Sequence, residues 1–303
     1  MDLPLPAPLL EHGYRGEDWG RWLAALPRLE RDVLDRWQLV VDGPARAGVS
    51  ALVLPVRTAE GEPAALRLGW PHPDQEHLHL ALRAWAGDAA VTLLRADPRR
   101  GVLLLERADA SRDLESADVL EACAVIAGLY GRLHRPPLPQ LDRLSDVARR
   151  WSGELTALDA AGVAPRRFVD QAAGLARELA TDPGTDRALL HGDLHYGNVL
   201  AGLGEREGEW LAIDGAPLAG DPAFEVAPLL SNRWPEAVAS HDLRGALVAR
   251  LETVVDAAGL DEDRVRGWVV VRSMMEFVWG LGDGRLDRDE VTRALTIVKA
   301  VQR

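Results

Sequence analysis

The sequence predicts an α+β protein in two lobes, a small antiparallel sheet lobe followed by a mainly helical lobe. Three observations support this prediction. The chain has 303 residues, 47% of them hydrophobic, so it is long enough for one large core or two smaller ones. Up to about Ala108, short apolar runs alternate with turn-rich spacers, whereas from Asp113 onward most segments carry apolar residues at helical spacing. We therefore expect a sheet lobe at 1–107 and a helical lobe at 108–303.

The first lobe is expected to begin with helices and to continue as two hairpins around one further helix. Residues 17–37 have apolar positions three to four apart and predict helices interrupted at Pro27. Residues 50–70 contain two apolar runs around the spacer AEGEP, which indicates a β-hairpin. Residues 71–87 start with a proline and predict a helix, and AVTLLRAD and GVLLLERA then indicate a second hairpin of buried strands.

The second lobe is expected to be helical except for one short stretch of strands. Only residues 188–214 revert to strand texture, with NVLAG and EWLAID forming a hairpin around the polar turn LGEREG. The segments expected to be helical are 115–135, 149–162, 166–180, 223–234, 241–259, 261–282 and 288–302.

Charge and cysteine usage exclude several classes of protein. A net charge of −12 argues against nucleic-acid binding, which needs clustered cations, and suits a small cationic ligand. No apolar run approaches the roughly 20 residues of a membrane span, and the start lacks the pattern of a secretory signal. The single cysteine, Cys123, cannot form an internal disulfide, which fits the cytoplasm. We expect no nucleic-acid or membrane partner, and the sequence determines no oligomeric state.

The stretch LHGDLHYGNVL, residues 190–200, carries the chemistry. Asp193 and Asn198 are five residues apart, and Asp214 ends the following apolar strand LAID. This order of side chains is typical of kinases. Phosphoryl transfer needs one carboxylate to accept the hydroxyl proton, which we assign to Asp193. It also needs oxygen ligands for Mg²⁺, which we assign to Asn198 and Asp214.

Two other interpretations of the same stretch remain open at this point. His191, Asp193 and His195 alternate as H-x-D-x-H, which on a strand would place them on one face and could bind zinc. No further His or Cys cluster supplies the remaining ligands. Alternatively, these polar groups only brace a loop.

Longer segments around these motifs resemble the family of aminoglycoside and hydroxyurea antibiotic resistance kinases. The segments are PVRTAEGEPAALRLGWPHP, LLRADPRRGVLLLERADASRDL, and HGDLHYGNVL followed by LAIDGAPLAGDPAFEVAPLLSNRW. The resemblance implies a two-lobed, protein-kinase-like fold that uses ATP and Mg²⁺. It also implies a small hydroxylated acceptor, such as streptomycin, phosphorylated at its 6-hydroxyl, or hydroxyurea.

The resemblance also implies roles for individual residues. Asp193 resembles the catalytic base, and Asn198 and Asp214 resemble the metal ligands. His191 would hydrogen-bond the backbone around Asp214. Asp221 and Glu225 are implied to support the site from behind. The residues implied to bind the nucleotide are Gly43 and Gly48 in the phosphate-covering loop, Arg67 at the phosphates, and the backbone of Glu106 and Ala108 at the adenine. Candidate acceptor contacts are Asn232, Arg233, Trp234, Trp268, Arg272, Glu276 and Trp279.

Three positions depart from the family pattern, and all belong to the phosphate end of the site. Arg67 replaces the strand lysine, and Leu78 stands where the neighbouring helix usually carries glutamate. Gly215 and Ala216 follow Asp214 in place of Pro-Lys. The alternative function is therefore a catalytically impaired, kinase-like protein that binds a nucleotide or another ligand without turnover.

Overall fold

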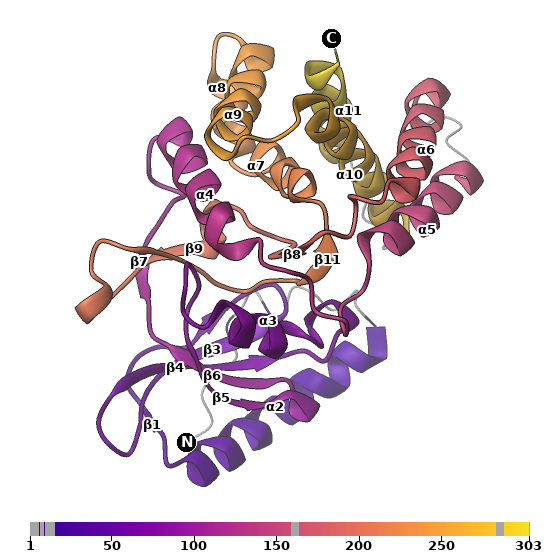
Figure 1. The fold of residues 1–303 in the computed structure, drawn as a ribbon. Coiled ribbons are helices and arrows are strands. Elements are labelled where there is room, and N and C mark those ends of the chain that lie inside the picture. The colour runs from indigo at the N-terminus through magenta and orange to yellow at the C-terminus, as the bar shows by residue number, and fades with distance from the viewer. Residues whose placement is uncertain (1–5, 7–8, 10–15, 159–163, 283–287, 303) are drawn as a thin grey trace. The chain divides into compact units, whose positions relative to one another are not determined.

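The chain divides into two compact units. The computed structural model describes residues 16–158, 164–282 and 288–302, together with Pro6 and Leu9 (Figure 1). Unit 1 comprises residues 1–110 and 201–211, and unit 2 comprises residues 111–200 and 212–303. The segment 201–211 groups with unit 1, whereas a single division at residue 108 assigns it to the second lobe. Three chain crossings, not one, therefore separate the units.

Unit 1 is built on an antiparallel sheet with the strand order β1-β3-β4-β6-β5, and β2 also pairs with β3. Both predicted hairpins are present, β3–β4 and β5–β6. The expectation of buried strands is wrong for β5, because β5 lies at the sheet edge and its residues are partly or fully exposed. The strands are β1 (Val40–Val41), β2 (Arg46–Ala47), β3 (Ala51–Arg57), β4 (Pro63–Gly69), β5 (Leu93–Asp97) and β6 (Val102–Glu106).

Helix α2 (Gly16–Trp37) covers one face of this sheet. Its buried side chains, among them Trp19 and Leu26, form one core with Leu54, Leu66 and other strand residues. The helix is continuous, so the predicted interruption at Pro27 is wrong. A proline removes one backbone hydrogen bond, but the apolar face of a long helix stabilises it on both sides of the proline.

Helix α3 (Leu78–Trp85) follows the short 3₁₀ turn η2 (Pro73–Gln75), so the helix begins later than its leading proline suggested. Leu78 and Trp85 are buried. Because side chains alternate along a strand, Arg67 of β4 points away from the α2 core that contains Leu66. The sheet therefore has one apolar face and one face that carries a buried cation.

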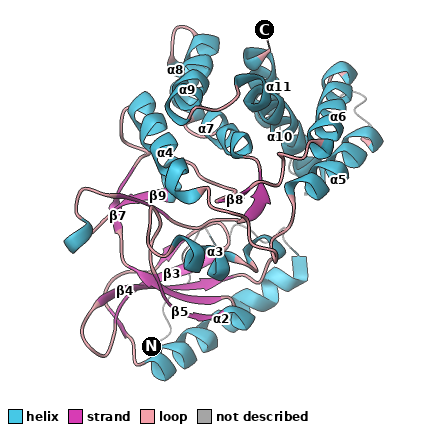
Figure 2. Ribbon diagram, viewed as in Figure 1, coloured by secondary structure: helices cyan, strands magenta, loops and turns pink. Residues whose placement is uncertain are grey.

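Unit 2 is mainly helical, as predicted (Figure 2). Asp118 caps the start of α4 by accepting hydrogen bonds from two backbone N–H groups, and Asp242 caps α9. The helices are α4 (Val119–Leu133), α5 (Leu144–Ala157), α6 (Arg166–Thr181), α7 (Ala227–Ser231), α8 (Trp234–Ala239), α9 (Leu243–Ala258), α10 (Glu262–Gly282) and α11 (Arg288–Val301).

The single helix expected at 223–234 is wrong. The structure has the 3₁₀ helix η6 (Pro222–Val226), then α7, and α8 begins only at Trp234. The break lies at Arg233, whose φ of 51° is left-handed. This backbone is held because Arg233 donates to Leu114 O and lies over the ring of Tyr196. A tertiary contact therefore overrides the local apolar pattern.

The remaining strands form two small sheets. β8 (Ala188–Leu190) pairs with β11 (Leu218–Gly220), and β10 (Trp210–Ala212), β9 (Val199–Ala201) and β7 (Asp109–Asp113) form a three-stranded sheet in that order. β9 and β10 are the predicted hairpin. β7 and β11 were not predicted, because β7 is polar and β11 lies in GAPLAGD, which contains no apolar run. In the described residues, no helix is both long and apolar enough to span a membrane.

Candidate active site

The segment that leads from β8 into the site depends on one glycine. Gly192 has a φ of +82°, and a Cβ built on it would lie 1.9 Å from Ala216 O. Only glycine fits this position without moving the backbone. The chain then presents Asp193, whose side chain is 46% exposed, and continues into the 3₁₀ turn η4 (Tyr196–Asn198).

Asn198 connects the other two residues of the predicted site. Its side-chain Nδ2 donates to Asp193 O at 2.8 Å, and its backbone carbonyl oxygen accepts from Ile213 N at 2.9 Å. Ile213 directly precedes Asp214, which has a left-handed φ of 54°. Asp193, Asn198 and Asp214 thus lie on one hydrogen-bonded stretch of unit 2. Since the Asn198 amide nitrogen faces Asp193, its side-chain oxygen is oriented away from that bond.

The chemistry of these side chains fits Mg²⁺. Asn198 and Asp214 offer an amide oxygen and a carboxylate, the hard oxygen ligands that Mg²⁺ prefers, with few protein ligands in total. Among the described residues, no group of three His, Cys, Asp or Glu side chains is placed to bind a metal. The zinc interpretation therefore lacks support, since His191 uses its Nε2 to donate to Ile213 O at 2.9 Å.

His191 lies beneath the site and is buried. Its Nε2 bond to Ile213 is the kind of backbone contact expected of it, and Ala216 N donates to His191 O at 2.8 Å. Burial lowers the pKa of His191 and outweighs the opposing charges of Glu225 and Asp193. The ring packs close to Gly215, where an added Cβ would lie 3.3 Å from a ring carbon.

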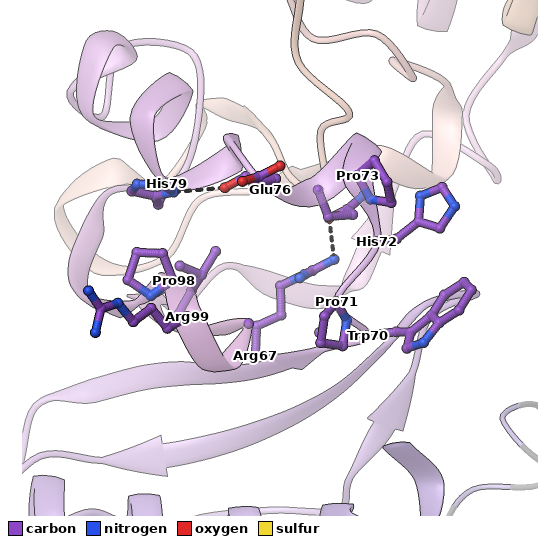
Figure 3. A pocket seen from close by; sticks show the side chains of 13 residues that line it. Arg67, Trp70, Pro71, His72, Pro73, Glu76, His79, Pro98 and Arg99 are labelled. Carbon is purple, nitrogen blue, oxygen red and sulfur yellow. Dashed lines mark hydrogen bonds between the residues drawn. The ribbon is translucent and has the colours of Figure 1, made fainter. Parts of the chain in front are cut away.

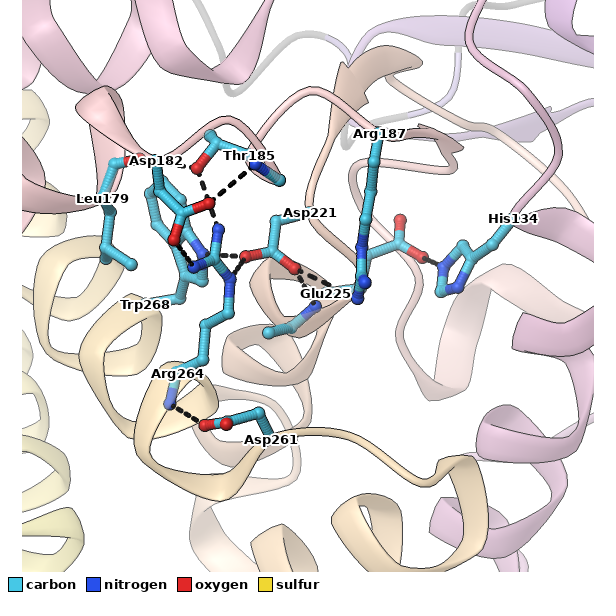
Figure 4. Close-up of polar contacts among 12 residues, drawn as sticks. His134, Leu179, Asp182, Thr185, Arg187, Asp221, Glu225, Asp261, Arg264 and Trp268 are labelled. Carbon is cyan, nitrogen blue, oxygen red and sulfur yellow. Dashed lines mark hydrogen bonds and ion pairs between the residues drawn. The ribbon is translucent and has the colours of Figure 1, made fainter.

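Glu225 supports the Gly192–Asp193 segment from the buried side. Its Oε1 accepts from Gly192 N at 2.5 Å. Its Oε2 accepts from His134 Nε2 at 2.8 Å, as Figure 4 shows. Burial alone would raise the Glu225 pKa, but the His134 bond and charge and the Gly192 bond lower it below its ordinary value. The sequence did not indicate His134, which stacks on Tyr130.

Asp221 fixes the start of α10 rather than the Gly192–Asp193 segment. It accepts hydrogen bonds from Ala223 N, from Trp268 Nε1 at 2.8 Å, and from Arg264 (Figure 4). Arg264 also bonds Asp182 at 2.7 Å. Trp268 is fully buried in these contacts, so its place among the acceptor candidates is not supported.

The nucleotide residues predicted for unit 1 include one with an unexpected partner. Arg67 is only 4% exposed, and its Nη2 donates to Gln75 Oε1 at 2.6 Å. Arg67 lines a cavity of about 370 Å³. Figure 3 shows its side chain reaching into this cavity. The side chains around Arg67 in this cavity include Trp70, His72, Gln75, Glu76, His79 and Arg99. Leu78, at the expected glutamate position, is buried, and Gln75 instead supplies the polar partner.

Glu106 and Ala108, the residues predicted to contact the adenine, differ in whether their backbone groups are already hydrogen-bonded. Glu106 N donates to Thr92 O at 2.8 Å within the sheet, so this N–H is not available to an adenine. Its carboxylate accepts from Thr92 and from Arg206 of the 201–211 segment. The Ala108 peptide groups, by contrast, form no hydrogen bond with other described residues. Of Glu106 and Ala108, Ala108 is therefore the better candidate for a backbone contact with the adenine.

The predicted phosphate-covering loop at 42–50 is shorter than expected. It contains β2, and Gly43 lies before that strand. Gly48 N donates to Ala51 O at 2.9 Å and closes the turn between β2 and β3. The turn that could cover phosphates is therefore residues 48–50.

Some of the candidate acceptor residues are hydrogen-bonded within the protein, and others are exposed to solvent. Asn232 Nδ2 donates to Pro228 O and ends α7, and Trp234 is half-buried at the start of α8. Arg272, Glu276 and Trp279 follow one another along α10 at helical spacing. Burial raises the pKa of the Glu276 carboxyl, opposed by Arg293 and Arg272, while Trp279 is 44% exposed.

Sequence comparisons decide the family once this geometry is known. The model of the aminoglycoside/hydroxyurea antibiotic resistance kinase family matches residues 36–284. The chain belongs to this family. A streptomycin 6-kinase of Streptomyces glaucescens is 41% identical, covering 98% of this chain and 97% of the relative. A hydroxyurea phosphotransferase of Kitasatospora aureofaciens is also 41% identical, covering 93% of this chain and 82% of the relative.

Solved structures confirm the fold. The choline kinase LicA of Streptococcus pneumoniae has a TM-score of 0.59 at 15% identity, covering 90% of this chain and 97% of LicA. The chain therefore has the protein-kinase-like fold predicted from its sequence. Family membership also confirms the predicted enzyme class, a phosphotransferase that acts on a hydroxyl group.

Proposed function

We propose that the chain transfers the γ-phosphoryl group of ATP to a hydroxyl group of a small molecule, with Asp193 as the base. The observation that carries this proposal is the single hydrogen-bonded stretch of Asp193, Asn198 and Asp214. Asn198 bonds the backbone of Asp193 on one side and that of Ile213, next to Asp214, on the other. The base and both oxygen ligands are thus held relative to one another before any substrate binds.

In the proposed reaction, the acceptor oxygen attacks the γ-phosphorus and the bond from that phosphorus to the bridging oxygen of ADP breaks. The acceptor proton passes to the Asp193 carboxylate. Asp193 can serve because nearly half of its side chain is open to solvent while its backbone is fixed. Mg²⁺, held by Asn198 and Asp214, would neutralise phosphate charge.

On unit 1, Arg67 is proposed to bind the nucleotide phosphates. Its guanidinium keeps the positive charge of the lysine it replaces and can form two parallel bonds to phosphate oxygens. Gln75 accepts a hydrogen bond from Arg67 and orients its guanidinium. Two solved relatives by fold were determined with AMP-PNP and with GDP, which supports nucleotide use here. The backbone of Ala108 is proposed to contact the adenine.

The acceptor is proposed to be an aminoglycoside such as streptomycin, phosphorylated at its 6-hydroxyl, or hydroxyurea. Both activities occur among relatives of equal identity. Glu276 is the carboxylate proposed to contact a cationic aminoglycoside, beside the charges of Arg293 and Arg272. A guanidinium or ammonium group could pair with it, and the exposed Trp279 could stack on a sugar ring.

Mass spectrometry tests the proposal directly. The full chain is incubated with ATP and Mg²⁺ and with streptomycin or hydroxyurea, and the product is examined for an added phosphoryl group. Asp193→Ala should lower kcat by about 10²- to 10⁴-fold while ATP binding, measured by calorimetry, stays within a few-fold. Asp170→Asn, an exposed carboxylate paired with Arg166, is the control and should leave kcat unchanged.

The alternative function, ligand binding without turnover, is tested by the same samples. ATP binding by the wild-type chain with no phosphorylated product from either acceptor would favour it. The features that support this alternative are Arg67 and Leu78 in place of the usual lysine and glutamate, together with Gly215. Asp193→Ala with full turnover would instead disprove the assignment of the base.

A further inference from the structure

Arg272 of α10 contacts the catalytic segment directly. Its Nη1 donates to Gly192 O at 3.2 Å, and its Nη2 lies 3.4 Å from Asp193 Oδ1. The guanidinium carbon is 4.8 Å from the centre of the Phe224 ring. The Arg272 side chain is only 15% exposed, so three contacts hold it in one place. The sequence had suggested this residue only as an acceptor contact.

We propose that Arg272 is a positioning residue for the Asp193 carboxylate. Its guanidinium engages Oδ1 and leaves Oδ2 for the acceptor hydroxyl. This inference rests on the proposed function, in which Asp193 is the base. The planar fork suits the task, because one nitrogen can bond the Gly192 carbonyl while the next reaches the carboxylate and the flat face rests on Phe224.

The same peptide segment is held from two sides. Glu225 accepts from Gly192 N, and Arg272 donates to Gly192 O. With the backbone fixed in this way, the remaining freedom of Asp193 is the rotation of its side chain. The Arg272 bond to Oδ1 restricts that rotation. The opposite oxygen, Oδ2, lies 3.9 Å from His195 Nε2, which is beyond a hydrogen bond.

Helix α10 holds the backbone of Arg272 in place. Its residues on either side of Arg272 are buried, among them Val271 and Ser273. Removing the guanidinium should therefore leave the backbone of the helix in place and remove only the contacts with the Asp193 carboxylate, the Gly192 carbonyl and the Phe224 ring. This makes a deletion of the side chain informative, since its effect should fall on catalysis more than on folding.

Steady-state kinetics of the full chain test the inference, with ATP, Mg²⁺ and whichever of streptomycin and hydroxyurea the wild type phosphorylates. Arg272→Ala should lower kcat by about 10²-fold, the cost of misplacing a reacting group by about 1 Å, while KM for ATP changes less than about threefold. Low, non-denaturing guanidinium should restore part of the kcat of Arg272→Ala. Arg272→Lys should recover only part of it, because an ammonium cannot make the planar double contact.

Arg266→Ala is the matched control. Arg266 lies on the same helix, is 14% exposed, and bonds Glu262 and Val301 O. It should keep wild-type kcat and show no response to guanidinium. Thermal unfolding of each variant checks that it is folded, and Arg272→Lys provides the test if Arg272→Ala does not fold.

Failure of this inference is distinct from failure of the proposed function. A wild-type chain that phosphorylates neither acceptor refutes the proposed function and, with it, this inference. An active wild type with Arg272→Ala or Arg272→Lys at full kcat overturns the inference alone. An equal loss and an equal guanidinium response in Arg266→Ala would also overturn it, since the effect would then belong to α10 as a whole.

Discussion

Gly192→Ala is expected to be among the most damaging single-methyl changes in the protein. The backbone of Gly192 is left-handed, which costs an L-residue about 1–2 kcal/mol. The new Cβ would lie 1.9 Å from Ala216 O, so that carbonyl must move by more than about 1 Å. Such overpacking costs about 1–3 kcal/mol, and loss of the bond from Ala216 N to His191 O adds about 1 kcal/mol.

These contributions predict a loss of about 3–6 kcal/mol in the free energy of unfolding. Urea unfolding followed by tryptophan fluorescence measures it. Gly208→Ala is the control, because Gly208 also has a left-handed φ, +91°, but its Cβ would meet nothing within 4 Å. Its free energy of unfolding should fall only by the conformational cost of about 1–2 kcal/mol. Equal losses in the two variants would refute the clash as the reason for the glycine.

Two further predictions concern Arg67 and His191. Gln75→Ala should lower kcat/KM for ATP by about tenfold, equivalent to one charged hydrogen bond of about 1.4 kcal/mol, and His77→Ala, which removes no capping bond, should not. Unchanged kcat/KM in Gln75→Ala would show that the amide does not orient Arg67. Because the folded-state pKa of His191 lies below its ordinary 6.5, its contribution to stability is complete above that pH and declines as the pH falls toward the folded-state value. Thermal unfolding between about pH 7.5 and pH 5 should therefore depend less on pH in His191→Asn than in the wild type, and parallel curves would contradict the assigned shift.

The sequence sufficed for the elements that form by local pattern. The hairpins β3–β4 and β5–β6 and the long helices of unit 2 all follow from apolar periodicity and turn residues. Local pattern failed where a distant contact decides the backbone. Pro27 stays within α2 because the helix buries a continuous face, and Arg233 breaks the 223–234 segment because it reaches Leu114 and Tyr196.

The sequence predicted those residues of the candidate site that belong to a known motif. The spacing of Asp193, Asn198 and Asp214 named the chemistry, and the side-chain hydrogen bond of Asn198 is a property of the fold that no spacing displays. Partners from remote segments were not predictable. Gln75 occupies no motif position, and His134 lies far from Glu225 in the chain. His134 is the C-cap of α4 and stands between Arg132 and Arg135, so the local sequence carries no signal for its contact with Glu225.

The 201–211 segment has a practical consequence for exchanging parts between related enzymes. A chimera joined once near residue 110 would combine Glu106 of one parent with Arg206 of the other, and these two side chains form an ion pair at 3.0 Å. Recombinants should therefore carry this short loop along with the amino-terminal part, with junctions inside β7, β9 and β10. Libraries built with a single crossover near residue 110 would mix parental partners at this pair in every clone.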